Sequence, residues 1–266
     1  MGIKLLSPFI KKYGKQVKLE DYSNKTIVID ISIFLYKNMY KANQNQFLKR
    51  FDYQINNFER YNITPIYIFD GPAPIEKKQT KDKRKESQKN MENPIIITRE
   101  DIEKLKNLLT QREIQFYTGS TEAEKMCSYL NKTGKADLCM SNDLDSLLFG
   151  CETLVTSQKD SLIEYKLSEI LKELDITLNE LIEIGIASGC DYHQQGIPGF
   201  GPSKALTKLK KSGSISNWGI ELNFDLTRLK QLFTDFSEEE KDAINIVKKE
   251  TLEDLGSLCS IESDSE

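Results

Sequence analysis

Three short apolar runs rich in β-branched residues each end in an aspartate: Lys25–Asp30, Pro65–Asp70 and Ala136–Asp143. Continuous apolar runs of this length are typical of strands buried on both faces, as in a parallel sheet covered by helices. Amphipathic helical patterns at 44–60, 98–111 and 122–132 lie between the runs. This alternation predicts an α/β fold in which a mostly parallel central sheet is flanked by helices.

The pattern changes after Cys151, where the chain becomes mostly helical. Two short strands are predicted at 151–156 and 161–165, followed by helices at 177–188, 202–211, 225–234 and 238–250. We therefore expect one domain over residues 1–251, with a helical C-terminal region, and a solvated, disordered acidic tail over 252–266. Within the domain, residues 71–98 are rich in lysine and have almost no apolar periodicity, which predicts an excursion from the core.

The composition excludes several classes of protein. Hydrophobic residues make up 38% of the 266 and charged residues 29%, a balance typical of soluble globular proteins. No apolar run reaches the roughly 18 residues that a membrane helix needs, and the start of the chain lacks the apolar segment of a signal peptide. The five cysteines form no Cys-x-x-Cys pair, so neither a disulfide framework nor a structural zinc site is expected. These features indicate an intracellular, reducing location.

The net charge of −4 hides an uneven distribution. Residues 250–266 contain six acidic residues and no basic one, so residues 1–249 carry +2. Between Lys77 and Lys89, seven basic residues stand against only two acids. A local basic stretch of this kind is compatible with a nucleic-acid partner even in a mildly acidic protein.

Carboxylates are the main candidates for chemistry. Because the carboxyl ends of parallel strands meet at one edge of a sheet, we expect the aspartates that end the three runs to lie together. Four further acids complete the candidate set, which is Asp30, Asp70, Glu122, Glu124, Asp143, Asp145 and Asp191. Single pairs also have local explanations, since Thr121–Glu124 fits a capping box and Asn142–Asp145 fits the start of a helix.

A metal site explains the whole set better than capping does. Seven carboxylates on one rim would repel one another strongly unless hard divalent cations bridged them. Ligands that are all oxygen select Mg²⁺ or Mn²⁺ over zinc, and two such ions can activate a water molecule against a phosphodiester. Without these seven acids, residues 1–249 carry +9, so a basic protein would surround an acidic site.

The basic excursion could hold a phosphate over this acidic site. Lys77, Lys81 and Arg84 are spaced by four and three residues, so they share one face if the segment is helical. Lys77 and Arg84 could then bind the scissile phosphate and stabilise the negative charge that develops as the phosphodiester bond is cleaved. The alternative is an ordinary solvated, lysine-rich surface.

A glycine loop offers a second phosphate contact. Gly199 and Gly201 precede a predicted helix that carries Lys204 and Lys208, so backbone N–H groups and a helix N-terminus are available there. The loop resembles a helix–hairpin–helix element, which contacts the DNA backbone without reading its sequence, although glycine turns between helices are also common without a ligand. The single histidine, His193, gives no support for a nucleophilic triad.

Five motifs occur in order along the chain: Met1-Gly2-Ile3; Val28-Ile29-Asp30-Ile31-Ser32; Phe69-Asp70-Gly71; Glu122-Ala123-Glu124 with Asn142-Asp143-Leu144-Asp145; and Gly189-Cys190-Asp191-Tyr192 leading into Gly199-Phe200-Gly201-Pro202. With nineteen residues from Glu124 to Asp143, this ordered set resembles the flap endonuclease/XPG family of structure-specific 5′-nucleases from Met1 to about residue 251.

The resemblance implies a PIN-like 5′-nuclease fold and a role for each candidate residue. The seven acids would bind two Mg²⁺ ions, for which Mn²⁺ can substitute, and catalysis would fall to Lys77, Arg84, Asp143 and Asp145. Lys77, Lys81 and Arg84 would lie on a gateway helix within 71–98, and Tyr36 would stack on a base near the cleaved bond. Residues 185–212 would form a helix–two-turn–helix that holds duplex DNA through Gly199, Gly201, Lys204 and Lys208, with help from a monovalent cation.

Some features of the chain point to a particular branch of the family. Glu122 follows Asp70 by only 52 residues, which predicts a gateway helix with a reduced cap. Gly189-Cys190-Asp191-Tyr192 followed by Gly196-Ile197-Pro198-Gly199 is similar to the Holliday-junction-resolving branch. The C-terminal end shows no clear sliding-clamp motif.

The sequence therefore predicts a Mg²⁺-dependent DNA nuclease that cuts at or near junctions between single strands and duplex, acting on flap, gapped or branched DNA. It would be a 5′-flap endonuclease, a 5′-3′ exonuclease or both, in DNA replication, repair or recombination. A Holliday-junction-type resolving nuclease is the alternative within this class. A non-catalytic DNA-junction-binding scaffold and a small-molecule phosphatase are alternatives from other classes. We expect a monomer, or a dimer on a symmetric junction, in the nucleus or at another site of DNA replication, such as a cytoplasmic factory if the source is viral.

Overall fold

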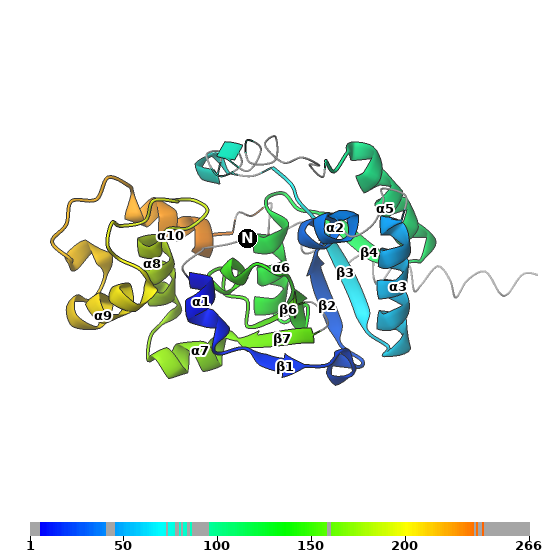
Figure 1. Ribbon diagram of the computed structural model, residues 1–266, viewed down its shortest axis with the longest axis horizontal. Coiled ribbons are helices and arrows are strands. Elements are labelled where there is room, and N and C mark those ends of the chain that lie inside the picture. Colours follow the sequence, from blue (N-terminus) through cyan, green and yellow to red (C-terminus); the bar gives the residue numbers. More distant parts are fainter. Residues whose placement is uncertain are drawn as a thin grey trace, which may run out of the picture.

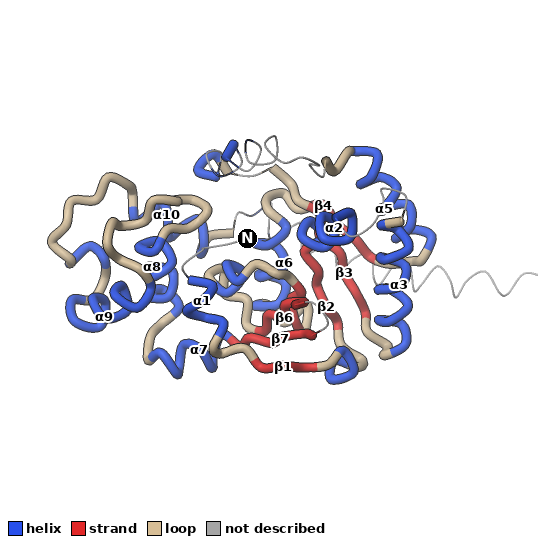
Figure 2. The backbone as a smooth tube through the Cα atoms, in the orientation of Figure 1, coloured by secondary structure: helices blue, strands red, loops and turns tan. Residues whose placement is uncertain are grey.

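The computed structural model describes residues 6–40, 46–72, 74–77, 80, 82–83, 86, 96–158, 161–236, 238 and 241. Within these residues, helices cover both faces of a seven-stranded sheet (Figures 1 and 2). The strands are β1 (Lys15–Val17), β2 (Thr26–Asp30), β3 (Thr64–Phe69), β4 (Gln115–Thr118), β5 (Leu138–Met140), β6 (Thr153–Gln158) and β7 (Ser161–Lys166).

The α-helices are α1 (Leu6–Lys11), α2 (Ile31–Tyr40), α3 (Phe47–Arg60), α5 (Arg99–Gln111), α6 (Ala123–Lys132), α7 (Leu167–Leu174), α8 (Leu178–Ser188), α9 (Pro202–Ser212) and α10 (Leu226–Thr234). Short 3₁₀ turns are η1 (Leu19–Tyr22), η2 (Ile75–Lys77), η3 (Leu144–Leu147) and η4 (Ile215–Asn217). None of the helices described is both long and apolar enough to span a membrane.

The sheet brings the ends of three strands to one edge. Its strand order is β1-β7-β6-β5-β2-β3-β4, and β2 runs parallel to both of its neighbours. This register sets Asp30 beside Ile68, two residues before Asp70, and Ile29 beside Met140, three residues before Asp143. β4 and β6 continue the parallel sheet, while β7 is antiparallel to β6 and to β1. The predicted mostly parallel sheet is therefore confirmed.

Alternation along the strands divides the core into two layers, as burial on both faces requires. Ile27 and Ile29 of β2 belong to a layer that also contains Phe51 of α3 and buried residues of α2 and α5. Val28, between them, belongs to the opposite layer with Met126 of α6 and buried residues of α1 and α7 to α10. Figure 2 shows the red strands enclosed between these two sets of blue helices.

The predicted helices correspond to α3, α5, α6, α8, α9 and α10, with ends shifted by at most three residues. The sequence pattern did not predict α1, α2 and α7 or strands β1 and β4. In α2 the pattern fails because apolar and aromatic residues occupy most positions of the helix, so it shows little amphipathic contrast. The predicted tail at 252–266 and most of the helix at 238–250 lie outside the described residues.

Candidate metal and nucleic-acid site

Two of the candidate acids lie at the ends of neighbouring strands and share a serine. Asp30 ends β2 and is buried, and its Oδ1 accepts a 3.1 Å hydrogen bond from the backbone N–H of Ser32. The hydroxyl of Ser32 donates to Oδ2 of Asp70 at 2.5 Å. Asp70 also accepts, through Oδ1, a 2.9 Å hydrogen bond from the N–H of Ala123 at the start of α6. Asp70 thus connects β3 to the helix that carries the next pair of acids.

Helix α6 brings Glu122 and Glu124 to the same edge. Glu122 occupies the N-cap position, but its side chain caps nothing; its Oε2 instead accepts a 2.7 Å hydrogen bond from the hydroxyl of Tyr192. Glu124 is buried and accepts a 3.2 Å hydrogen bond from the hydroxyl of Ser146. The capping-box explanation of this pair therefore does not hold, because both carboxylates point to other elements of the fold.

Asp143 and Asp145 occupy the turn that follows β5, and both are buried. The side chain of Asp143 caps η3 by accepting a 3.2 Å hydrogen bond from the N–H of Asp145. Here the local explanation is correct, since Asp143 does act as an N-cap. The cap leaves the carboxylate at the strand edge, in electrostatic range of Asp30 and Glu124.

The buried acids repel one another. Burial, together with the neighbouring charges of Asp70 and Asp143, raises the pKa of Asp30 to about 8. Burial and the charges of Asp143 and Asp145 likewise raise the pKa of Glu124 well above its usual value. A positive charge supplied nearby favours the ionised form of such a carboxyl group and lowers its pKa.

A lysine supplies part of that charge. Lys77, at the end of η2, is buried, and its amino group contacts Glu122 and lies 3.1 Å from Oδ2 of Asp191. Burial lowers the pKa of Lys77, but attraction by Glu122, Glu124 and Asp191 outweighs it and raises the pKa overall. Figure 1 shows the cyan segment with η2 passing above the sheet edge where α2 and α6 begin. The described part of the excursion therefore brings Lys77 into contact with the acids.

The donor set suits a hard divalent cation. In the described part of the chain, no three or more Asp, Glu, His or Cys side chains are arranged to hold a metal ion as they stand, and Lys77 neutralises Glu122 and Asp191 instead. The remaining donors are all carboxylate oxygens, are mostly buried, and repel one another. These are the properties that Mg²⁺ and Mn²⁺ sites require of their ligands.

The glycine loop joins α8 to α9 through a tight backbone contact. The N–H of Ile197 donates a 2.7 Å hydrogen bond to the carbonyl of Ala187. A Cβ at Gly196, whose φ is +58°, would lie 2.5 Å from that same carbonyl oxygen, so only glycine fits there. Gly199, with φ of +83°, is exposed and has open space around it, and Gly201 is the N-cap of α9. The loop therefore presents unobstructed backbone to solvent at a helix N-terminus.

The lysines of α9 and the lone histidine differ in role. Lys204 is exposed and Lys208 is half-buried on the helix that follows the loop. The ring of His193 packs against Phe224 with centroids 4.3 Å apart, and its Nε2 lies 3.1 Å from the carbonyl oxygen of Gly196. These contacts give His193 a structural role in the loop.

Comparisons with known proteins agree with this geometry. Residues 1–91 match the family model of the XPG N-terminal domain, and residues 113–191 match that of the XPG I-region. Flap endonuclease 1 of Entamoeba histolytica is 31% identical over 260 residues, which cover 82% of this chain and 69% of that protein. The chain belongs to the flap endonuclease/XPG family. It is accordingly a structure-specific nuclease, a class of phosphodiester hydrolase in which dependence on divalent metal is typical.

Solved structures confirm the 5′-nuclease fold. The catalytic core of Rad2 in complex with DNA substrate superposes with a TM-score of 0.71 at 24% identity, covering 92% of this chain and 79% of that one. The Holliday junction-resolving enzyme GEN1 in complex with product DNA and Mg²⁺ has a TM-score of 0.69 at 18% identity, covering 91% of this chain and 67% of that one. The family fold thus extends over nearly the whole described chain.

The structure brings most of the predicted site residues together, but not all of them are described. Asp30, Asp70, Glu122, Glu124, Asp143, Asp145, Asp191 and Lys77 share one edge of the sheet, whereas Lys81 and Arg84 lie outside the described residues. Tyr36 is half-buried on α2, which begins directly after Asp30.

Sequence reasoning did not assign a role to Ser32, Ser146 or Tyr192, which hold the acids in place. Ser32 and Tyr192 fall inside two of the recognised motifs, next to Asp30 and Asp191, and that adjacency was the available signal. Ser146, which binds Glu124, lies just outside the motif that ends at Asp145 and so had no such signal.

Proposed function

We propose that this protein is a Mg²⁺-dependent DNA nuclease that hydrolyses phosphodiester bonds at or near junctions between single strands and duplex. The observation that carries the proposal is a group of buried, mutually repelling carboxylates at the carboxyl edge of a parallel sheet, with Lys77 of a basic excursion set against them. A silent DNA-binding scaffold has no need of these costly buried charges.

In this proposal, Asp30, Asp70, Glu122, Glu124, Asp143, Asp145 and Asp191 hold two Mg²⁺ ions. Bound there, the ions would supply an activated water molecule and stabilise the oxygens of the phosphodiester. Ser32, Ser146 and Tyr192 orient the carboxylates through their hydroxyl groups. Lys77, with Arg84, neutralises the scissile phosphate when DNA replaces the acids as its partner.

The C-terminal region would hold the duplex. Backbone N–H groups near Gly199 and Gly201, the N-terminus of α9 and the side chains of Lys204 and Lys208 can all contact phosphates without reading sequence. A monovalent cation in the loop would add a further positive charge. Tyr36, near the start of α2, would stack on an unpaired base. We expect a monomer on flap or gapped DNA.

A matched pair of aspartates tests the metal assignment. Asp143 follows β5, whereas Asp137 precedes it at the opposite edge of the sheet and accepts hydrogen bonds from Thr26 and Lys25. Asp143→Asn is expected to lower cleavage of a labelled 5′-flap substrate in Mg²⁺ by about 10³-fold or more, with DNA binding retained. Asp137→Asn is expected to cleave normally. If Asp143→Asn cuts within about tenfold of the wild type, the metal assignment is wrong.

Holliday-junction resolution is the second candidate, and two observations favour it. The short interval from Asp70 to Glu122 and the sequence around Asp191 are both similar to the resolving branch, of which GEN1 shares the fold. Mapping the cuts on 5′-flap, gapped and four-way DNA separates the candidates: symmetric paired cuts by a dimer on the four-way substrate favour resolution. Tight binding to all three with no cut in Mg²⁺ or Mn²⁺ would favour a scaffold.

A further inference from the structure

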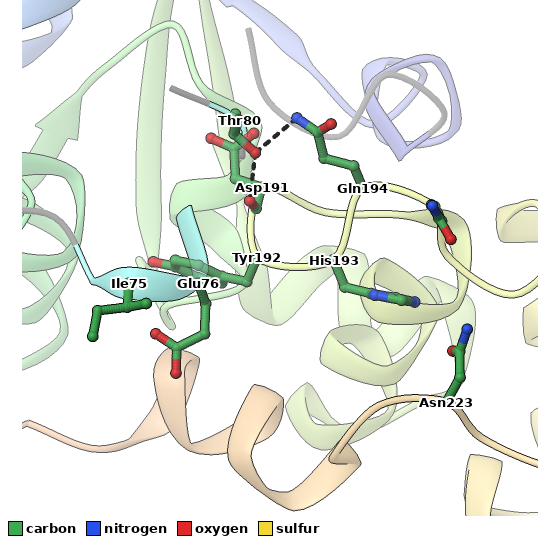
Figure 3. A pocket seen from close by; sticks show the side chains of 9 residues that line it. Ile75, Glu76, Thr80, Asp191, Tyr192, His193, Gln194 and Asn223 are labelled. Atoms are coloured by element: carbon green, nitrogen blue, oxygen red, sulfur yellow. Dashed lines mark hydrogen bonds between the residues drawn. The ribbon is translucent and has the colours of Figure 1, made fainter. Parts of the chain in front are cut away.

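A chain of hydrogen bonds ties the basic excursion to the loop after α8. The hydroxyl of Thr80 donates to the backbone carbonyl of Asp191 at 2.7 Å and accepts from Nε2 of Gln194 at 2.7 Å. The amino group of Lys83 donates to Oε1 of Gln194, also at 2.7 Å. Figure 3 shows Thr80 between Asp191 and Gln194, with both bonds as dashed lines. Thr80 is buried with only 3% of its surface exposed, so its hydroxyl is fully committed to these partners.

Further contacts hold the excursion to the rest of the protein. Thr80 and Lys83 are both helical, and Glu76 lies in η2. Glu76 extends the contact to the C-terminal region, because its Oε1 accepts a 2.8 Å hydrogen bond from Nε of Arg228 in α10. All three residues of the excursion therefore bind protein.

Asp191 is held to the excursion at two points. Its carboxylate lies 3.1 Å from the amino group of Lys77, and its backbone carbonyl accepts from Thr80, three residues further along. Because Asp191 is held at both its side chain and its backbone carbonyl, its orientation relative to Lys77 is fixed. A single ion pair between flexible side chains would not fix this orientation. Gln194, in turn, lies two residues before Gly196, where the glycine loop begins its tight turn.

We infer that Thr80 and Gln194 are positioning residues that couple the glycine loop to the placement of Lys77 and Asp191. The inference rests on the proposed function, because it assigns them to the same cleavage site. Duplex DNA bound at the glycine loop restrains Gln194. The hydrogen bond from Gln194 then restrains Thr80, and Thr80 in turn restrains the positions of Lys77 and Asp191. A duplex arm bound at the glycine loop strengthens these existing contacts, whereas an isolated single strand does not, so the coupling favours junctions.

An isosteric pair of variants tests the coupling. Thr80→Val keeps the shape of the side chain and removes its hydroxyl, whereas Thr80→Ser keeps the hydroxyl. With the full chain and a 5′-flap substrate, Thr80→Val is expected to lower the single-turnover rate at saturating DNA by about tenfold or more. The Kd for the same DNA, measured in Ca²⁺, is expected to stay within about twofold, because Thr80 makes no proposed DNA contact. Thr80→Ser is expected to restore the rate.

Two further readouts separate coupling from a general loss of structure. Amide hydrogen exchange over residues 75–86 is expected to speed up in Thr80→Val and Gln194→Met and to return to the wild-type rate in Thr80→Ser. The double variant Thr80→Val with Gln194→Met is expected to be no slower than either single variant, since both break one chain of contacts. Multiplicative losses in the double variant, or wild-type rate and exchange in Thr80→Val, would overturn the inference. If the wild-type protein cuts no DNA, the proposed function fails, and the exchange comparison alone then decides the coupling.

Discussion

The amino group of Lys77 lies 3.1 Å from Oδ2 of Asp191 and also contacts a carboxylate oxygen of Glu122. Lys77 comes from the basic excursion, Glu122 from the start of α6 and Asp191 from the loop after α8, so this contact joins three distant segments of the chain. A buried lysine with two acid partners supplies part of the positive charge that the acids of this site require.

Replacing Lys77 is expected to destabilise the metal-free protein. Lys77→Met leaves the buried Glu122 and the half-buried Asp191 without their cation, and removing one partner of a buried ion pair costs about 3 kcal/mol or more. Urea denaturation in EDTA measures this loss in the free energy of unfolding. Adding Mg²⁺ is expected to reduce it, because a bound cation stabilises the folded state through the same acids.

Lys104→Met provides the control for Lys77. Lys104 forms an exposed pair with Glu100 on α5, so its replacement is expected to change stability by less than about 0.5 kcal/mol with or without Mg²⁺. Equal destabilisation of the two variants, or a destabilisation by Lys77→Met that Mg²⁺ leaves unchanged, would contradict the charge argument.

Tyr36 is expected to act through its ring rather than its hydroxyl. Stacking of one base on an aromatic side chain is worth about 1–3 kcal/mol, so Tyr36→Ala is expected to slow flap cleavage about 10- to 100-fold. Tyr36→Phe keeps the ring and is expected to stay within about twofold of the wild type. The fluorescence of 2-aminopurine placed beside the cut site reports the stacking directly. If Tyr36→Phe slows cleavage as much as Tyr36→Ala does, the hydroxyl is the functional group.

The lysines of α9 are expected to contribute electrostatically. Each phosphate that a protein neutralises on duplex DNA adds about 0.9 to the steepness of log K against log salt, so Lys204→Ala and Lys208→Ala should each flatten the salt dependence of duplex binding by about one unit. Cleavage rates at saturating DNA are expected to change little. Lys172→Ala, at an exposed position on α7, is the control and should keep the wild-type slope. An unchanged slope in both α9 variants would place the duplex elsewhere.

Asn131 is expected to be the most sensitive polar position in the core. Its Oδ1 accepts from the N–H groups of Glu152 and Thr153 at 2.8 and 3.0 Å, and its Nδ2 donates to the carbonyls of Ala136 and Asp137. Asn131→Leu leaves these backbone groups unpaired, and each such group costs about 1–3 kcal/mol.

Chemical denaturation should therefore show a loss of about 3 kcal/mol or more in the free energy of unfolding of Asn131→Leu. Thr133→Val, at an exposed position just after the same helix, is expected to change stability by less than about 0.5 kcal/mol. Comparable behaviour of the two variants would mean that water satisfies the groups that Asn131 now binds.

Patterns local in the sequence predicted the parts of the fold that depend on local forces. The three apolar runs ending in Asp30, Asp70 and Asp143 became β2, β3 and β5, because only a fully buried strand tolerates such runs. The ordered motifs then supplied the acids of the candidate site.

The contacts that hold the site together were not predictable in this way. Thr80 and Gln194 are 114 residues apart in the chain, and neither belongs to a periodic pattern or a charged cluster. The edge strands β1 and β4 are short and only half-buried, so their apolar signal is weak. Such features depend on tertiary packing, which brings together residues whose neighbours in the sequence say nothing about each other.

The acids at the sheet edge come from five separate stretches between Asp30 and Asp191. During synthesis on the ribosome, a chain that has not yet emerged past Asp191 lacks part of the pocket, and Lys77 has only one of its two partners. If these acids hold the metal ions as proposed, a nascent form of this nuclease is expected to cleave no DNA until the segment with Asp191 has folded against the others.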